Sequence, residues 1–177
     1  NNSNKVVVVN RYTMEKEDVI IGDDILNPRY FVAGNGKGYI SNWGDPFNTE
    51  DDFITVVSFS TNEVLSTIPV GEGPEKMLLM GERLYVCLQG GYGTNNKVVV
   101  INAEDNSIDE TLSVGDVPNS ILPDRNSDIW VLCQGKPSYS GDETNGSLFK
   151  IEAGSNALSS QAFTPIQHPS LLNYEDE

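Results

Sequence analysis

The chain has 177 residues, of which 38% are hydrophobic and 21% are charged, a balance typical of a folded globular domain rather than a disordered segment. Eleven Lys and Arg stand against 26 Asp and Glu, and the net charge of −15 repels nucleic-acid phosphates and anionic membrane surfaces. No run of about 20 apolar residues is present to cross a bilayer. The composition therefore argues against a nucleic-acid partner and against a transmembrane segment.

The sequence repeats itself, and the repeat is the main guide to the fold. Residues 4–10 recur almost unchanged as residues 96–102, an offset of 92 residues that indicates a unit of half this length. Diverged copies of the same segment occur at residues 53–59 and 146–152. Four prolines keep a similar spacing, with intervals of 46, 44 and 51 residues: Pro28, Pro74, Pro118 and Pro169.

The predicted elements of one unit are four short extended segments. After Pro74 these segments cover residues 76–80, 84–89, 97–102 and 108–114. They are rich in β-branched and apolar residues, and clusters of Gly, Asn, Asp and Glu separate them as turns. Apolar residues at helical spacing are not sustained anywhere in the chain.

Four strands in a unit of 40 to 50 residues are typical of one blade of a β-propeller, an all-β fold built from four-stranded antiparallel sheets. A β-sandwich is the main rival, but a sandwich has no reason to repeat the same residues at a fixed period. We therefore expect residues 1–177 to form one propeller segment of about four blades, truncated at both ends. The blades should begin near residues 28, 74, 118 and 169, with a partial blade at 1–27.

Two cysteines, Cys87 and Cys133, are too few for a disulfide framework and too isolated for a zinc site. In the repeat, Cys87 aligns with Leu132 and Cys133 aligns with Leu88, so the two thiols lie on opposite faces of equivalent strands. We expect both thiols to be free and buried.

Three segments resemble the YVTN-repeat family of β-propellers, also described as YncE-like or surface-layer-protein propellers: residues 67–74, 84–89 and 97–102. The Asn-Pro-Arg-Tyr run at 27–30 and the Gly-Gly-Tyr run at 90–92 are similar to those of surface lipoproteins of Gram-negative gut bacteria. Since family members usually have seven blades, the resemblance implies that this chain is part of a longer protein.

The resemblance also places the loops between second and third strands on one face, around the central channel. These loops are long here, at residues 43–52, 89–96 and 134–145. Long loops are often functional, although they are also where insertions are tolerated. Their aromatic side chains could stack on a flat ligand or simply cap the tops of the blades.

Candidate ligand-binding residues are the loop aromatics, the amides that repeat the position of Trp43, and the residues after the blade prolines. In chain order they are Arg29, Trp43, Phe47, Glu75, Gln89, Tyr92, Asn119, Gln134 and Tyr139. Arg29 is either an anchor for an anionic ligand or an internal salt-bridge partner.

Four acidic residues crowd the first loop and form a weak candidate for calcium: Asp45, Glu50, Asp51 and Asp52. The spacing of an EF-hand loop is absent, so no metal site is the main expectation. Asp142 and Glu143 in the third loop are a weaker version of the same pattern.

Catalytic motifs are not recognisable, and no catalytic residue or cofactor is expected. The lone His168 precedes a proline and has no partnered Ser or Cys motif, which favours a turn residue. The glycines at 34, 36 and 38 lack the helix that a dinucleotide fingerprint requires.

A non-catalytic binding or scaffolding module is therefore the leading hypothesis, with a small molecule or a partner protein bound on the loop face. The family resemblance implies an extracytoplasmic location, at the bacterial cell surface or in the periplasm, and capture of corrinoid-type nutrients together with an outer-membrane transporter. Two alternatives remain open. One is a structural surface-layer protein, and the other is a propeller enzyme with a cofactor in the central channel.

Overall fold

The computed structural model describes residues 3–45, 47–91, 95–173 and 175. Within these ranges the regular structure is antiparallel β-sheet, apart from one short 3-10 turn, η1 (Ser138–Ser140). No helix in the described part of the chain is long and apolar enough to cross a membrane.

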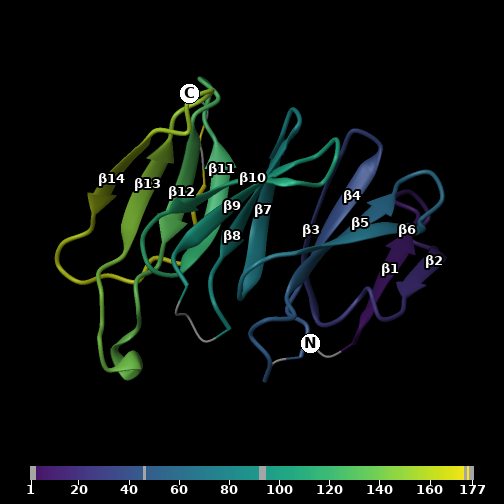
Figure 1. The fold of residues 1–177 in the computed structure, drawn as a ribbon, viewed down its shortest axis with the longest axis horizontal. Helices are drawn as coiled ribbons and strands as arrows, with labels where there is room; N and C mark the ends of the chain where they lie inside the picture. The colour runs from purple at the N-terminus through teal and green to yellow at the C-terminus, as the bar shows by residue number, and fades with distance from the viewer. Residues whose placement is uncertain (1–2, 46, 92–94, 174, 176–177) are drawn as a thin grey trace.

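Three complete four-stranded sheets follow one another along the chain and lie side by side (Figure 1). The first contains β3 (Pro28–Gly34), β4 (Lys37–Asn42), β5 (Phe53–Ser58) and β6 (Val64–Pro69). The second contains β7 (Pro74–Met80), β8 (Arg83–Leu88), β9 (Lys97–Asn102) and β10 (Ile108–Ser113). The third contains β11 (Pro118–Pro123), β12 (Ile129–Cys133), β13 (Ser147–Ile151) and β14 (Leu158–Ala162). We refer to them as blades one, two and three.

A two-stranded hairpin of β1 (Lys5–Val9) and β2 (Lys16–Ile21) packs beside blade one (Figure 1). In every sheet each strand pairs with its neighbour in sequence, so the connections are simple hairpins. The all-β class and the four-stranded antiparallel blades predicted from the repeat are thus confirmed.

The blades hold together through apolar layers between their faces. In β8, Tyr85 and Cys87 contact the core shared with blade three, whereas Leu84, Val86 and Leu88 contact the core shared with blade one. This alternation is the period of two that an extended strand imposes. Burying each such aliphatic side chain contributes about 1.5–3 kcal/mol, so these layers stabilise the contact between blades.

Turns repeat as faithfully as the strands do. The hairpins β5–β6, β9–β10 and β13–β14 each contain an asparagine with positive φ, namely Asn62, Asn106 and Asn156, at 60°, 66° and 54°. In each case the backbone N–H of this asparagine donates to the carbonyl four residues earlier. Asparagine tolerates this left-handed conformation better than most residues, which explains its recurrence here.

The long loops β4–β5, β8–β9 and β12–β13 all emerge at the same end of the strands, the lower end in Figure 1. The β6–β7 connection reaches the same end, since its residue Glu72 contacts Gly91 of the β8–β9 loop. We call this end of the molecule the loop face. It carries every long loop in the described part of the chain.

Residues 163–173 form no strand but run alongside β11. The side-chain amide of Asn119 donates to the carbonyl of Pro169 at 3.3 Å, and the backbone N–H of Leu172 donates to Ser120 Oγ at 3.3 Å. The segment therefore contacts the first strand of blade three.

Candidate functional site

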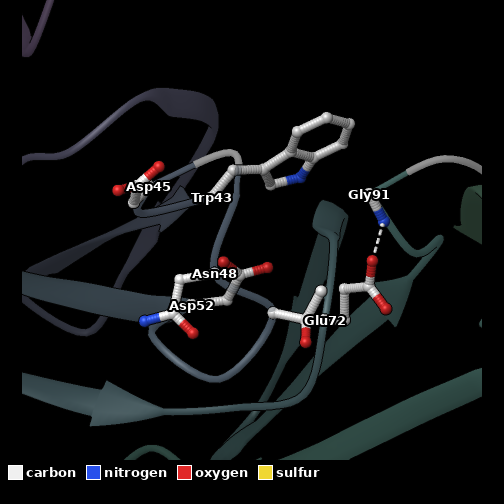
Figure 2. Close-up of a pocket in the computed structure, with 7 residues that line it drawn as sticks. Trp43, Asp45, Asn48, Asp52, Glu72 and Gly91 are labelled. Atoms are coloured by element: carbon white, nitrogen blue, oxygen red, sulfur yellow. Dashed lines mark hydrogen bonds between the residues drawn. The ribbon is translucent and has the colours of Figure 1, made fainter.

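A cleft opens on the loop face between blades one and two, with a cavity volume of about 80 Å³. Three connections build it: the β4–β5 loop, the β6–β7 connection and the β8–β9 loop. Figure 2 labels most of the residues that line it: Trp43, Asp45, Asn48, Asp52, Glu72 and Gly91. Three of these, Trp43, Asp45 and Asp52, are residues that the sequence singled out.

Two contacts of the indole ring hold Trp43 in place. Its indole Nε1–H donates to the carbonyl of Pro74 at 3.1 Å, and the Arg29 guanidinium lies 4.3 Å from the ring centroid. Arg29 does not itself line the cleft. The indole is therefore held between a cation and the cleft, as a preorganised wall.

Arg29 forms an ion pair with Glu75, with 2.9 Å between Nε and Oε1. Glu75 is 4% exposed, and this burial raises the pKa of its carboxyl group, although the Arg29 charge lowers it. The structure thus brings Arg29, Trp43 and Glu75 together, and of the two roles considered for Arg29 it shows the internal salt bridge.

Asp52 is the most deeply placed acid of the cleft, with 4% of its surface exposed. Its Oδ2 accepts the backbone N–H of Gly73 at 2.6 Å. Burial raises the pKa of Asp52 to about 6, and the neighbouring charges of Asp51 and Glu72 act in the same direction. Glu72 itself accepts the backbone N–H of Gly91 at 2.8 Å, drawn as the dashed line in Figure 2.

Two of the acids considered for calcium, Asp45 and Asp51, organise their own loop. Asp51 Oδ2 accepts the Asp45 N–H at 3.0 Å, and Asp45 Oδ1 accepts the Phe47 N–H at 3.0 Å. Glu50 is exposed, and Asp51 Oδ1 is buried without a hydrogen-bond partner. Among the residues that the structure describes, no group of three or more His, Cys, Asp or Glu side chains could hold a metal ion.

The remaining loop candidates lie elsewhere on the loop face. Phe47 and Tyr139 are 91% and 85% exposed and pack against little of the protein. Gln89 is half-buried, and its backbone N–H donates to the Gly73 carbonyl at 2.7 Å. Tyr92 lies outside the described residues.

Asn119 and Gln134 belong to a second polar cluster, on blade three. Their side chains approach each other at 3.4 Å, between Asn119 Nδ2 and Gln134 Oε1. His168 Nδ1 lies 3.0 Å from the Gln134 carbonyl, and His168 Nε2 lies 3.0 Å from Glu143 Oε1. Glu143 and the Gln134 carbonyl raise the pKa of His168, so both ring nitrogens are used in holding residues 163–173 against blade three.

Cys87 and Cys133 are free and fully buried, as predicted, and both lie in the core between blades two and three. Burial raises the pKa of the Cys133 thiol to about 12, and it raises the pKa of the Cys87 thiol as well. Because the thiolate is the reactive form, neither residue is suited to act as a nucleophile at neutral pH.

Sequence reasoning missed Glu72, Asn48 and Gly91. A signal for Glu72 was available in the repeat, because Asp116 stands at the same place before the next blade, so an acid recurs there. Gly91 carries no side chain and gave no signal of its own. The contribution of these residues depends on how two blades meet.

No protein-family model matches the chain, and no curated protein matches its sequence. Solved structures do match its fold. Kuenenia stuttgartiensis hydrazine synthase is 17% identical with a TM-score of 0.75, and the match covers 90% of this chain and 43% of that one. Dihydro-heme d1 dehydrogenase NirN, in complex with DHE, is 13% identical with a TM-score of 0.66 over 93% of this chain and 34% of that one.

The WD40 domain of Neurospora crassa Pan2 is 12% identical with a TM-score of 0.64, and the match covers 93% of this chain and 48% of that one. The chain thus spans less than half the length of each of these three proteins. At such low identity the likeness concerns the fold alone. The fold is that of a β-propeller, a class whose members include enzymes as well as WD40 domains.

Proposed function

We propose that the protein is a non-catalytic binding module whose loop face recognises a small molecule or a partner protein. The observation that carries this proposal is the cleft between blades one and two, where a fixed indole and several carboxylates converge. Concave sites with an aromatic wall and a few polar groups are the usual form of a ligand site. Binding residues lie disproportionately on loops that a rigid scaffold positions, as the blades do here.

The resemblance to YVTN-repeat propellers supports an extracytoplasmic role in nutrient capture. We place the protein at the bacterial cell surface or in the periplasm, where a corrinoid-type ligand would be passed to an outer-membrane transporter. A flat macrocycle could not enter a cleft of about 80 Å³. It would lie across the rim, on exposed aromatic side chains such as Phe47 and Tyr139.

An enzymatic role is the second candidate, because two of the structural neighbours are enzymes. The chain's single histidine, His168, uses both ring nitrogens in contacts within the protein. Its partner Glu143 and the Gln134 carbonyl account for both contacts. This geometry supports a role in holding the chain rather than in moving protons.

A thermal-shift screen tests the binding proposal. The protein is mixed with single nutrients, including cobalamin, other corrinoids, sugars and amines, and every compound that raises Tm is retested on two variants. For a compound small enough to enter the cleft, Trp43→Ala should abolish the shift because it removes the cleft wall. Tyr12→Ser is the matched control, since Tyr12 is 81% exposed in the β1–β2 turn, away from the cleft.

Three results would count against the proposal. They are no Tm shift with any compound, a shift of equal size in the Trp43 variant for every compound small enough to enter the cleft, or chemical conversion of a bound compound detected by mass spectrometry. If other compounds raise Tm and cobalamin does not, the corrinoid assignment is wrong and the binding role stands.

A further inference from the structure

The cleft between blades one and two carries negative charge that the protein does not neutralise. Asp45, Asp52 and Glu72 line it, and in the part of the chain that the structure describes none of the three forms an ion pair. Asp52 is 4% exposed, and only its Oδ2 has a hydrogen-bond partner. Its Oδ1 has no hydrogen-bond partner among the described residues, and the side chain lines the cleft.

The equivalent position between blades two and three carries a lysine that the cleft lacks. The repeat can be aligned there through backbone conformation, because Gly90 and Gly135 both have positive φ, at 86° and 78°, as do Gly73 and Val117, at 73° and 59°. The residues that follow Gly90 and Gly135 are therefore equivalent to each other. The residues that precede Gly73 and Val117 are equivalent to each other as well.

By this alignment Glu72 corresponds to Asp116, and Gly91 corresponds to Lys136. The Lys136 ammonium lies 2.5 Å from Asp142, and both Asp142 and Asp116 raise its pKa. Between blades two and three, the recurring acid Asp116 accepts the Thr144 hydroxyl at 2.8 Å, and the repeat also supplies an ammonium group, that of Lys136, which pairs with Asp142. Between blades one and two the same acid is present, but the lysine is replaced by a residue without a side chain.

We propose that the cleft binds a protonated amine or guanidinium group, which takes the place that Lys136 fills in the neighbouring repeat. The inference rests on the proposed function, since it names the ligand class for the same loop face. Asp52 and Glu72 would accept N–H bonds from the cation, with Asp45 at the rim. Charge-assisted bonds of this kind are about twice as strong as neutral ones.

The size and shape of the cleft agree with this ligand class. A volume of about 80 Å³ accommodates a head group of a few atoms, well below the roughly 300–1,000 Å³ of sites that enclose a whole drug-sized ligand. The Trp43 indole supplies an aromatic wall, and aromatic faces attract cations. Since the carboxylates do not gather into a metal-binding group within the described ranges, they suit the several N–H donors of an organic cation better than one metal ion.

The test uses NMR titration of the protein at low ionic strength and about pH 7.5, with butylammonium and butylguanidinium as probes and 1-pentanol as the neutral control. The chain has two tryptophans, so the indole N–H signal of Trp130 is an internal reference for that of Trp43. We expect both cations, and not the alcohol, to shift the Trp43 indole and the Gly91 amide. Equal shifts with the alcohol, or shifts with CaCl₂ but with neither organic cation, would overturn the proposal.

Variants make the test specific. Asp52→Asn should weaken binding of butylguanidinium at least tenfold, and Gly91→Lys should abolish it by supplying the ammonium from within the protein. A Cβ at Gly91 would lie 2.8 Å from Glu72 Oε1, the end of a flexible side chain that can move aside. Gly91→Ser and Asp109→Asn are the controls, the latter on exposed β10. Unchanged affinity in Asp52→Asn and Gly91→Lys would refute the inference.

The source of the cation is decided by two further probes, N-acetyl-lysine amide and N-acetyl-arginine amide. Tighter binding of these than of the butyl compounds identifies a side chain of a partner protein, and the reverse identifies a free small amine. If compounds from the thermal-shift screen bind in a manner that needs Trp43 while no cation binds, the ligand class is wrong and the binding role stands.

Discussion

Asp52→Asn should stabilise the protein at neutral pH, although it removes an acid that lines the cleft. In the native protein, burial raises the pKa of Asp52 from 3.8 to about 6. Each pKa unit corresponds to about 1.4 kcal/mol, so ionised Asp52 costs about 3 kcal/mol of unfolding free energy at pH 7. Asparagine carries no charge, and its Oδ1 can still accept the Gly73 N–H.

The sign of the pH dependence follows from the same shift. Between about pH 4 and pH 6 the folded state binds more protons at Asp52 than the unfolded state does, so this group lowers stability as the pH rises. Below the unfolded pKa the variant and the native protein should therefore differ little. Above about pH 6 the full difference should be present.

Urea unfolding followed by circular dichroism measures this directly, at about pH 4.5 and about pH 7.5. Asp109→Asn removes the same charge from the exposed surface of β10 and controls for net charge. The reasoning is refuted if Asp52→Asn is no more stable than the native protein at the higher pH, or if its advantage is the same at both pH values.

Three further outcomes are expected. Arg29→Met leaves the buried Glu75 carboxylate without its cation and should lower the unfolding free energy by about 3 kcal/mol in urea titrations, whereas Arg29→Met combined with Glu75→Gln should recover at least half. Equal losses in the single and double variants would contradict the role of the pair. Ile54→Ala opens a cavity at a fully buried position between blades one and two and should cost about 3 kcal/mol in the same assay, and a cost below about 1 kcal/mol would be too small for that packing. Ellman's reagent should modify neither Cys87 nor Cys133 in the native protein and both after denaturation, so a fast-reacting native thiol would oppose the assignment.

The fold could be predicted from sequence because it depends on patterns that are local and repeated. The alternation of Val98, Val99, Val100 and Ile101 between two neighbouring cores is set by strand geometry alone. The repeat then carries the same strand order from one blade to the next. Local conformation is enough to define a blade.

The candidate site was only partly predictable, because its groups meet through tertiary contacts. Trp43 was recognised as an aromatic residue on a long loop, but the Arg29 guanidinium against its ring comes from the first strand of the blade. Asp52 was noticed as one of four adjacent acids and interpreted through calcium. Its environment is instead set by Gly73, which is 21 residues away in sequence.

The layered arrangement has a consequence for how the protein opens. The sheet of β7 to β10 packs against a complete blade on each face, whereas one face of blade one packs against only the β1–β2 hairpin and its connection, and β14 is exposed along its whole length. In a stack in which each blade contacts only its neighbours, local unfolding begins where one side is uncovered. Amide hydrogen exchange should therefore be slowest in β8 and β9 and progressively faster toward β14 and the β1–β2 hairpin. The cleft would lie beside the slowest-opening sheet, so its wall at Gly91 would keep its position while the outer strands fluctuate.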